Sequence, residues 1–332
     1  MEKDTVLEVK DLNVSFYTNQ RCNNVLRGIS FSLRKGKTLC VVGESGCGKS
    51  VTASSVMQLL PELSRIEGGS ITYRYRDEEV RIDKLGKNSS QMRALRGEEI
   101  AMIFQDPMTA LNPVFTVGYQ ISEMLRAHMR ISEKEAMARS VELLKDMGVP
   151  LPEQRVHEYP HQFSGGMRQR AMIAMAMACK PKILIADEPT TALDVTIQAQ
   201  IFDLMLELKE KNDMAILLIT HDMGVVAEMA DDVAVMYMGN IVESGTAEEV
   251  LGFPLHPYTK ALLASIPVLG RGHNQDLQPI KGSTPDPFDR PHGCQFEPRC
   301  GFSCPECSLA MPEEVIVSGT HMVRCCRCKE VV

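Results

Sequence analysis

The chain has 332 residues, of which 44% are hydrophobic and 24% charged, and its formal net charge is −7. This composition supports a large buried core and about two domains, and the acidic balance argues against a nucleic-acid-binding surface, which would be basic. The N-terminus has no apolar signal segment, and the longest apolar runs, such as AMIAMAMAC at 171–179, are far shorter than the roughly 20 residues of a membrane span. We therefore expect a chain that is neither secreted nor membrane-spanning.

The first hundred residues predict short strands. Segments 6–17, 28–36 and 68–83 alternate apolar and polar residues and end in turn residues, which favours an antiparallel sheet. The segment TLCVVG at 38–43 is instead a continuous apolar run, typical of a strand buried on both faces of a parallel sheet. It leads into a glycine-rich turn and a helical pattern at 49–60. We predict a strand, loop and helix unit here.

A helical insertion is predicted next, over about 106–179. Residues 117–147 have helical periodicity, Ser132 and Glu135 form a potential capping box, and Gly148 is a helix stop. The buried-type strands KILIAD, AILLIT and DVAVMYM then alternate with helical stretches, so the parallel sheet resumes.

Near residue 255 the composition changes to proline, glycine, aspartate and cysteine with little periodicity. We therefore predict an α/β domain over 1–255 and a small cysteine-rich extension over 256–332.

The motif GESGCGKS at 43–50 fits the P-loop pattern, and it follows a buried strand and begins a helix, as a phosphate site requires. Glycines let the backbone approach a phosphate, the N–H groups and the helix N-terminus supply partial positive charge, and Lys49 adds a full charge. Ser50 is a predicted Mg²⁺ ligand. The residues assigned to nucleotide binding here are Gly43, Glu44, Ser45, Gly46, Cys47, Gly48, Lys49, Ser50 and Val51.

The segment ILIADE at 183–188 supplies two carboxylates. Asp187 emerges at the carboxyl end of a buried strand, the edge where α/β sheets bind ligands, and we expect it to hold Mg²⁺ opposite Ser50. Glu188 precedes Pro189, which disfavours helix there, so the two carboxylates take different directions. We assign the metal to Asp187 and the attacking water to Glu188.

Four shorter pieces are individually weak signals. Ser164, Gly165 and Gly166 in FSGGMRQR precede a helix and predict a second anion-binding N-terminus. Gln105 ends a strand, and His221 follows another. Asp194 lies in TALD. The order of these pieces along the chain is what carries information.

In this order, the motifs resemble those of the ATP-binding subunits of ABC transporters over roughly residues 5–255. The resemblance implies that Phe16 or Tyr17 stacks on adenine. It also implies that Gln105 senses Mg²⁺, which it helps to hold, and the membrane subunit, that Glu188 is the general base and that His221 contacts the γ-phosphate. Ser164, Gly165, Gly166 and Asp194 would complete the nucleotide contacts.

One departure is FSGGM where the commonest family form is LSGGQ, but the Ser-Gly-Gly core is kept. The resemblance further implies a head-to-tail dimer, in which each ATP lies between the P-loop of one subunit and the Ser164 motif of the other.

Seven of the eleven cysteines lie between 294 and 328, and two spacings compete there. Cys304, Cys307, Cys325 and Cys328 form C-x2-C-x17-C-x2-C, a fair match to a zinc site by spacing alone. The surrounding segments HPYTKALLASIP, GCQFEPRC and HMVRC instead resemble those of oligopeptide and dipeptide importers. That resemblance implies a [4Fe-4S] cluster on four thiolates, the usual ligation for this cluster. The implied ligands are Cys294, Cys300, Cys307 and Cys325, which leaves Cys304, Cys326 and Cys328 over.

The resemblance implies an ATPase subunit that drives the uptake of di- or oligopeptides through two membrane permease subunits. Its cofactors would be ATP, Mg²⁺ and the [4Fe-4S] cluster, with zinc as the alternative. A paralogous ATPase subunit would complete the dimer, an extracellular binding protein would deliver substrate, and the chain would lie at the cytoplasmic face of the membrane. Nickel or oligosaccharide import, a soluble ABC ATPase and a metal-sensing regulator are the alternatives. Because the P-loop core has its own buried sheet, we expect nucleotide binding to survive loss of the cluster.

Overall fold

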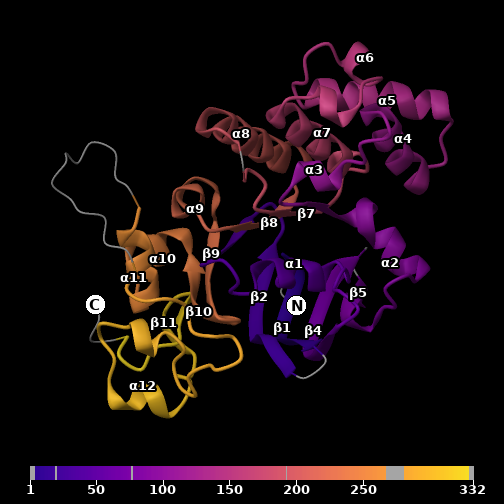
Figure 1. Ribbon diagram of the computed structural model, residues 1–332. Coiled ribbons are helices and arrows are strands. Elements are labelled where there is room, and N and C mark those ends of the chain that lie inside the picture. The colour runs from indigo at the N-terminus through magenta and orange to yellow at the C-terminus, as the bar shows by residue number, and fades with distance from the viewer. Residues whose placement is uncertain (1–3, 19–20, 76–77, 192, 267–279, 329–332) are drawn as a thin grey trace. The chain divides into compact units, whose positions relative to one another are not determined.

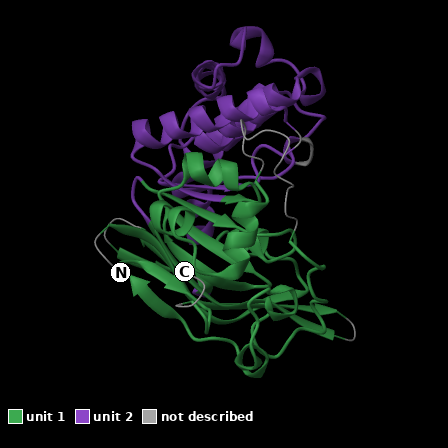
Figure 2. Cartoon of the chain, turned by 90° about the vertical axis from the view of Figure 1, so that its left-hand side faces the viewer, with its two compact units in different colours: residues 1–33, 37–83, 219–332 green, residues 34–36, 84–218 purple. Residues whose placement is uncertain are grey.

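A computed structural model describes residues 4–18, 21–75, 78–191, 193–266 and 280–328 (Figure 1). The chain divides into two compact units, coloured green and purple in Figure 2. Unit 1 comprises residues 1–33, 37–83 and 219–332, and unit 2 comprises 34–36 and 84–218. Unit 1 therefore combines the two ends of the chain, and unit 2 holds its middle.

An antiparallel sheet in unit 1 has the strand order β2-β1-β4-β5. Its strands are β1 (Thr5–Thr18), β2 (Arg21–Arg34), β4 (Ser64–Tyr75) and β5 (Glu78–Arg81). Leu7 of β1 lies opposite Tyr73 of β4, and both are buried. Because alternate residues of a strand point to the same face, the alternating sequence pattern buries one face of this sheet.

A second group of strands in unit 1 contains the predicted parallel core. β3 (Thr38–Val42) is buried throughout and pairs in parallel with β9 (Asp232–Tyr237), which turns back antiparallel into β10 (Asn240–Thr246). β12 (His321–Val323) joins β10, and β11 (Val315–Ser318) joins β12. The helical elements of this unit are α1 (Lys49–Val56), α9 (Met223–Met229), α10 (Ala247–Gly252), α11 (Pro257–Ala264), η4 (Glu297–Arg299) and α12 (Pro305–Leu309).

A buried carboxylate fixes the C-terminal extension to β10. Glu243 is fully buried, and its carboxylate accepts hydrogen bonds from the backbone N–H groups of Leu255 (2.7 Å) and His256 (2.9 Å). His321 of β12 places its Nε2 2.8 Å from the same carboxylate. Since a buried charge is costly unless it is hydrogen-bonded, these three contacts explain how β10 carries a glutamate in its interior.

Unit 2 contains the parallel pair β6 (Ile100–Ile103) and β7 (Ile183–Asp187), with five helices between them in the sequence. Those helices are α3 (Pro107–Ala110), α4 (Val117–His128), α5 (Glu133–Asp146), α6 (Pro152–Arg155) and α7 (Gly165–Met177), with η3 (Pro160–Gln162) before α7. The unit also holds α2 (Ser90–Ala94), η2 (Leu95–Glu99) and α8 (Val195–Asn212). β8 (Ala215–Thr220) and η1 (Ile82–Lys84) cross the division between the units.

The helix starts follow the sequence signals. Ser132 caps α5 by accepting from the N–H of Glu135 at 3.2 Å, and Thr116 caps α4 in the same way. The predicted capping box is only half formed, because the Glu135 carboxylate accepts from Arg139 instead, at 2.8 Å. This i,i+4 ion pair competes with the reciprocal bond to Ser132.

Among the described residues, no helix is long and apolar enough to cross a lipid bilayer.

Candidate functional site

The P-loop of unit 1 connects β3 to α1. Its residues are largely fixed by packing: Lys49 is only 4% exposed, whereas Ser50 beside it is exposed. Gly48 has a φ of +110°, and a Cβ there would lie 2.8 Å from the Leu26 side chain. Only glycine adopts this conformation without strain, so the loop geometry explains the second glycine of the motif.

The Lys49 side chain is hydrogen-bonded to the backbone of the P-loop. Its Nζ donates to the carbonyl oxygens of Gly43 at 2.7 Å and Glu44 at 3.1 Å. The ammonium group is thereby positioned at the start of α1, where the helix N-terminus adds positive potential. Cys47 is buried, which raises the pKa of its thiol, and this supports a packing role.

The two aromatic candidates for adenine stacking differ in exposure. Phe16 is half-buried, whereas Tyr17 is 38% exposed near the end of β1. The Tyr17 hydroxyl donates to Glu67 at 2.6 Å, and this hydrogen bond raises its pKa to about 12. The Tyr17 side chain is therefore uncharged at physiological pH, and it is partly accessible to solvent.

Three predicted residues of unit 2 lie around the end of β7. Asp187 is the last residue of β7 and is buried. Glu188 follows with a φ of +45°, a left-handed conformation that costs a non-glycine residue about 1–3 kcal/mol. Its carboxylate accepts hydrogen bonds from Gln105 Nε2 at 3.0 Å and from the hydroxyl of Thr191 at 3.3 Å. The predicted base is thus held away from helical geometry and oriented by a glutamine amide.

The remaining predicted residues of unit 2 begin helices. Ser164 caps α7 by accepting from the N–H of Met167 at 3.3 Å, and Asp194 caps α8 by accepting from Ile197 at 3.0 Å. Gly166 packs so closely on α8 that a Cβ would lie 2.8 Å from the side chain of Ile197. The Ser-Gly-Gly sequence thus begins α7 with Ser164 and Gly165 exposed, as expected of an anion-binding helix start.

The motif residues are distributed over both units. The P-loop and the aromatic pair lie in unit 1, as does His221, which is exposed directly after β8. Gln105, Asp187 and Glu188 lie in unit 2.

A cavity in the C-terminal extension is lined by five cysteines. They include the whole predicted ligand set, together with one cysteine that the sequence analysis left over: Cys294, Cys300, Cys307, Cys325 and Cys326. Burial and the neighbouring thiolates of Cys307, Cys325 and Cys300 raise the pKa of the Cys294 thiol to about 11. The four predicted thiols therefore face one space, at distances where their charges interact.

The cysteines outside the predicted ligand set, Cys304, Cys326 and Cys328, lie in two environments. Cys304, Cys307 and Cys326 have sulfur atoms within 4.8 Å of one another, so Cys307 belongs both to this group and to the cavity. Cys328 instead packs with Leu255 and Val323 in a small apolar cluster. This packing explains the burial of Cys328 without a metal. It also weakens the case for the alternative zinc site, in which Cys328 would be the fourth ligand.

Three residues that contact these sites were not assigned a role from the sequence. Thr191 binds Glu188, while Tyr258 and Arg299 of the extension bind Glu44 in the P-loop. All three lie in segments quoted above for the resemblance: Thr191 in TALD, Tyr258 in HPYTKALLASIP and Arg299 in GCQFEPRC.

Two family models match the chain. Residues 26–191 match the model described as ABC transporter, and residues 242–307 match the Oligopeptide/dipeptide transporter, C-terminal region. The second match includes Cys294, Cys300 and Cys307.

Similar proteins extend over nearly the whole length. The dipeptide transport ATP-binding protein DppD of Bacillus subtilis is 51% identical over 326 residues, which cover 98% of this chain and 95% of that protein. The oligopeptide transport ATP-binding protein OppD of the same organism is 50% identical over 320 residues, covering 96% and 88%.

Among solved structures, the dimeric structure of MJ0796, a bacterial ABC transporter cassette, has a TM-score of 0.63 at 25% identity and covers 73% of this chain and 98% of that one. CbiO1 from Clostridium perfringens has a TM-score of 0.62 at 27% identity, covering 76% and 92%. The expected ABC ATPase fold with its cysteine-rich extension is confirmed. The chain belongs to the ATP-binding, ATP-hydrolysing subunits of ABC transporters, a family that works with membrane permeases.

Proposed function

We propose that this chain is the ATPase subunit of a di- or oligopeptide importer. The observation that carries the proposal is the combination, in one chain, of an ABC transporter region with the oligopeptide/dipeptide C-terminal region, at 51% identity to a dipeptide transport protein over nearly the full length of both. The chain would act at the cytoplasmic face of the membrane, and an extracellular binding protein would bring peptides to the permeases.

In this proposal the residues of the P-loop, Gly43 to Val51, bind the ATP phosphates, with Lys49 as the full positive charge. Ser50, Asp187 and Gln105 are the Mg²⁺ ligands, and Tyr17 stacks on adenine in preference to the half-buried Phe16. Glu188 takes the proton of the attacking water, and Gln105 keeps its carboxylate oriented through the 3.0 Å hydrogen bond. His221 contacts the γ-phosphate.

A second subunit completes each ATP site. Ser164, Gly165 and Gly166 begin α7 with Ser164 and Gly165 exposed, and they would bind the ATP held by the partner's P-loop. Asp194 would support this contact from the start of α8. Since each chain carries one P-loop and one Ser164 motif, we propose a head-to-tail dimer, with a paralogous ATPase as the partner.

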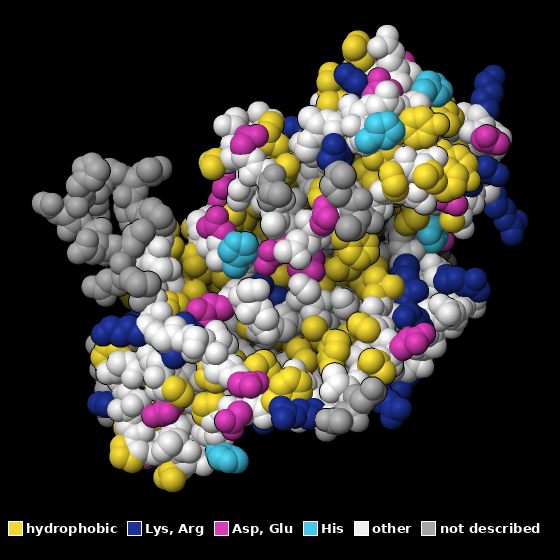
Figure 3. All heavy atoms as spheres, viewed as in Figure 1, with side chains coloured by type: hydrophobic (Ala, Val, Ile, Leu, Met, Phe, Trp, Pro, Cys, Tyr) yellow, Lys and Arg dark blue, Asp and Glu magenta, His cyan; other side chains and the backbone are white. Residues whose placement is uncertain are grey.

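A hydrophobic surface on unit 2 is our candidate for the permease contact. Figure 3 shows hydrophobic and histidine side chains gathered over the helical part of this unit. Val114, Phe115, Tyr119 and Tyr159 are between 39% and 70% exposed, and Phe115 stacks on Tyr119 at 4.9 Å. The N–H of Val117 binds the carbonyl of Glu158, which brings the two segments together. Phe115→Ser should reduce copurification with the permeases and leave MgADP binding unchanged.

We further propose that Cys294, Cys300, Cys307 and Cys325 hold a [4Fe-4S] cluster. The fit is supported by the chemistry of the cavity lining: five cysteines face one space, and these four among them match the usual four-thiolate ligation of this cluster. Bound there, the cluster would cross-link the extension covalently. The regular elements in the described part of this module are short helices and two short strands, so metal ligation would supply stability that a large core supplies elsewhere.

The central test is Glu188→Gln. If Glu188 is the general base, this variant should bind ATP normally and lose ATP turnover by roughly 100- to 10,000-fold, the usual contribution of a general base. Turnover is measured with the partner ATPase and permeases in proteoliposomes, alongside uptake of a labelled dipeptide. Normal turnover in the variant excludes the assigned base, and absent dipeptide uptake by the complete wild-type complex excludes the assigned substrate class.

A further inference from the structure

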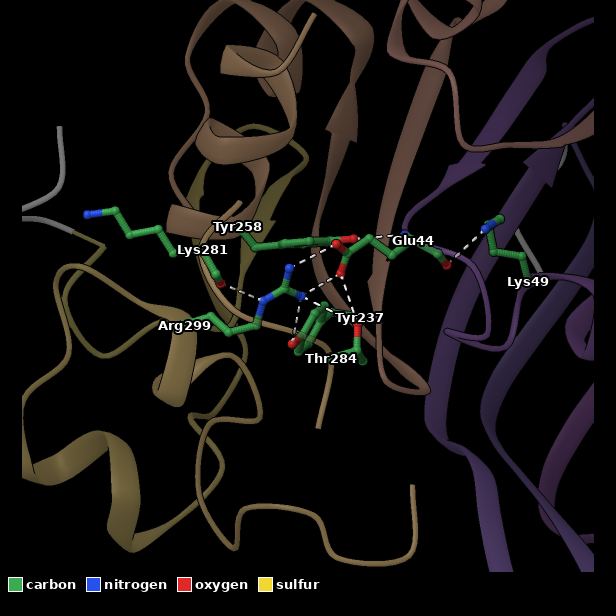
Figure 4. A network of polar contacts seen from close by, with 7 residues as sticks. All are labelled: Glu44, Lys49, Tyr237, Tyr258, Lys281, Thr284 and Arg299. Carbon is green, nitrogen blue, oxygen red and sulfur yellow. Dashed lines mark hydrogen bonds and ion pairs between the residues drawn. The ribbon is translucent and has the colours of Figure 1, made fainter. Parts of the chain in front are cut away.

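A salt bridge joins the P-loop to the cysteine-rich module within unit 1. Arg299 Nη1 lies 2.6 Å from Glu44 Oε2, and Nη2 lies 3.0 Å from Oε1, so the guanidinium binds both carboxylate oxygens (Figure 4). The arginine side chain is 4% exposed and the glutamate side chain 27%. Two-point, largely buried contacts of this kind are among the stronger ion pairs in proteins. The pair connects residues 255 positions apart.

Arg299 is itself fixed by the module. Its Nε donates to the carbonyl of Lys281 at 3.1 Å, and its guanidinium lies 5.9 Å from the ring centres of Tyr237 and Phe296. Arg299 ends η4 and directly precedes Cys300, one of the thiols that line the cavity. The local fold of the cysteine module therefore sets the position of this arginine.

Glu44 is held on three sides. Its side chain binds Arg299, its N–H donates to the hydroxyl of Tyr258 at 2.8 Å, and its carbonyl accepts from Lys49 at 3.1 Å. Figure 4 shows these groups converging, with Thr284 on the same carboxylate. Two of the three anchors, Arg299 and Tyr258, come from the region after residue 255.

The salt bridge also changes the electrostatics of the P-loop. A carboxylate in a phosphate-binding loop repels the phosphates of a nucleotide, and this repulsion is strongest where the carboxylate lacks a countercharge. Arg299 supplies that countercharge at Glu44.

We propose that Arg299 is a positioning residue for nucleotide binding, which holds and neutralises Glu44 so that the cysteine module sets the affinity of the P-loop. This role rests on the proposed nucleotide site at Lys49. Nucleotide binding would still survive loss of the cluster, as expected from the sequence, but with a lower affinity. The reacting groups are not touched by Arg299, so its effect falls on binding.

The test compares equilibrium binding of MgADP to the purified full-length chain and its variants. Arg299→Gln should weaken binding roughly tenfold, within the usual range of coupling between sites. Glu44→Gln added to Arg299→Gln should not weaken binding further and should recover part of the loss, because it removes the unpaired carboxylate that repels the phosphates. Arg299→Lys keeps the positive charge but lacks the planar guanidinium that binds both carboxylate oxygens. Its MgADP affinity should therefore lie between those of the wild type and Arg299→Gln.

Arg290→Gln is the matched control. Arg290 also fastens the extension to the rest of unit 1, through the carbonyl of Met238 and the side chain of Asn23, both at 2.9 Å, and these contacts lie outside the P-loop. Its MgADP affinity should stay within about twofold of wild type, a difference too small to indicate coupling. Equal losses in Arg290→Gln and Arg299→Gln, wild-type affinity in Arg299→Gln, or additive effects of Glu44→Gln and Arg299→Gln each overturn the proposal.

Reciprocity supplies a second measurement. If the module supports the P-loop, MgADP must in turn stabilise the module. Hydrogen exchange of backbone amides in 294–307 should therefore slow with saturating MgADP in the wild type and not in Arg299→Gln. Unchanged exchange in the wild type counts against the proposal. Lys49→Ala distinguishes failure of the proposed nucleotide site from failure of the coupling through Arg299. If this variant binds MgADP normally, the proposed nucleotide site itself is wrong.

Discussion

In the P-loop, the proposed phosphate-binding groups are mainly backbone N–H groups in one short segment. In the cysteine cavity, the proposed metal-binding groups are side-chain thiols spread from Cys294 to Cys325. The P-loop is fixed by a buried strand before it and a helix after it. The cavity is assembled from turns, a short helix and the end of a β-hairpin. A backbone site is therefore formed mainly by local geometry, whereas a thiol site needs the whole module to be folded.

Lys49→Ala tests the first half of this comparison and should have the largest effect. Removing one partner of a buried charged contact costs about 2–5 kcal/mol, so we expect MgADP affinity to fall by about 100-fold. Titration calorimetry measures it. The metal content of the cysteine module should be unchanged, and a simultaneous loss of metal would show that the two sites are one cooperative structure.

Cys307→Ser tests the second half. Protein purified without oxygen should be brown with about four irons per chain, as expected for a [4Fe-4S] cluster, and the variant should be colourless. Through Arg299, its MgADP affinity should drop roughly tenfold, the same as for Arg299→Gln. Iron analysis and absorption spectra measure the first effect. Stoichiometric zinc in a colourless wild-type protein would restore the zinc alternative.

Gly48→Ala separates backbone geometry from side-chain chemistry. The φ of +110° and the 2.8 Å approach to Leu26 predict a strain of about 1–3 kcal/mol. The variant should lose both stability in thermal unfolding and MgADP affinity. Gly252→Ala is the control, because an added Cβ there meets open space. Equal behaviour of the two variants contradicts the geometric explanation of the P-loop glycine.

Cys328→Ala should have the smallest effect. Cys328 packs against Leu255 and Val323 as an apolar residue, so its loss should cost about 1 kcal/mol of unfolding free energy and leave iron content and MgADP affinity unchanged. Chemical denaturation and iron analysis measure the two quantities. Loss of iron from this variant would return Cys328 to the ligand set.

Local signals were sufficient for much of the molecule. The P-loop, the buried strand before Asp187 and the cap at Ser132 are defined by residues within a few positions of one another, and each was predicted from the sequence. The bridge from Arg299 to Glu44 could not be predicted, because no spacing rule relates side chains that far apart. The gathering of Cys326 with Cys304 and Cys307 was missed for the same reason, since it depends on how the hairpin β11–β12 meets α12.

The roles assigned to Glu188, His221 and the four cysteines rest on the resemblance and stay predictions. What the structure adds is local support, such as the Gln105 hydrogen bond on Glu188 and the shared cavity of the thiols. The hydrogen bond from Gln105 to Glu188 was not visible in the sequence, because it joins residues from separate elements.

The buried carboxylate of Glu243 bears on the order in which the chain is assembled during synthesis. Two of its partners, the amides of Leu255 and His256, emerge from the ribosome soon after it, but His321 follows 78 residues later. Until His321 arrives, β10 keeps a charged group open to water and cannot close its buried face. β12, the last strand along the described residues, thus completes the surroundings of β10 in the ATPase core. We expect a chain that ends at residue 255 to fold less stably than the full protein, although it retains every nucleotide motif.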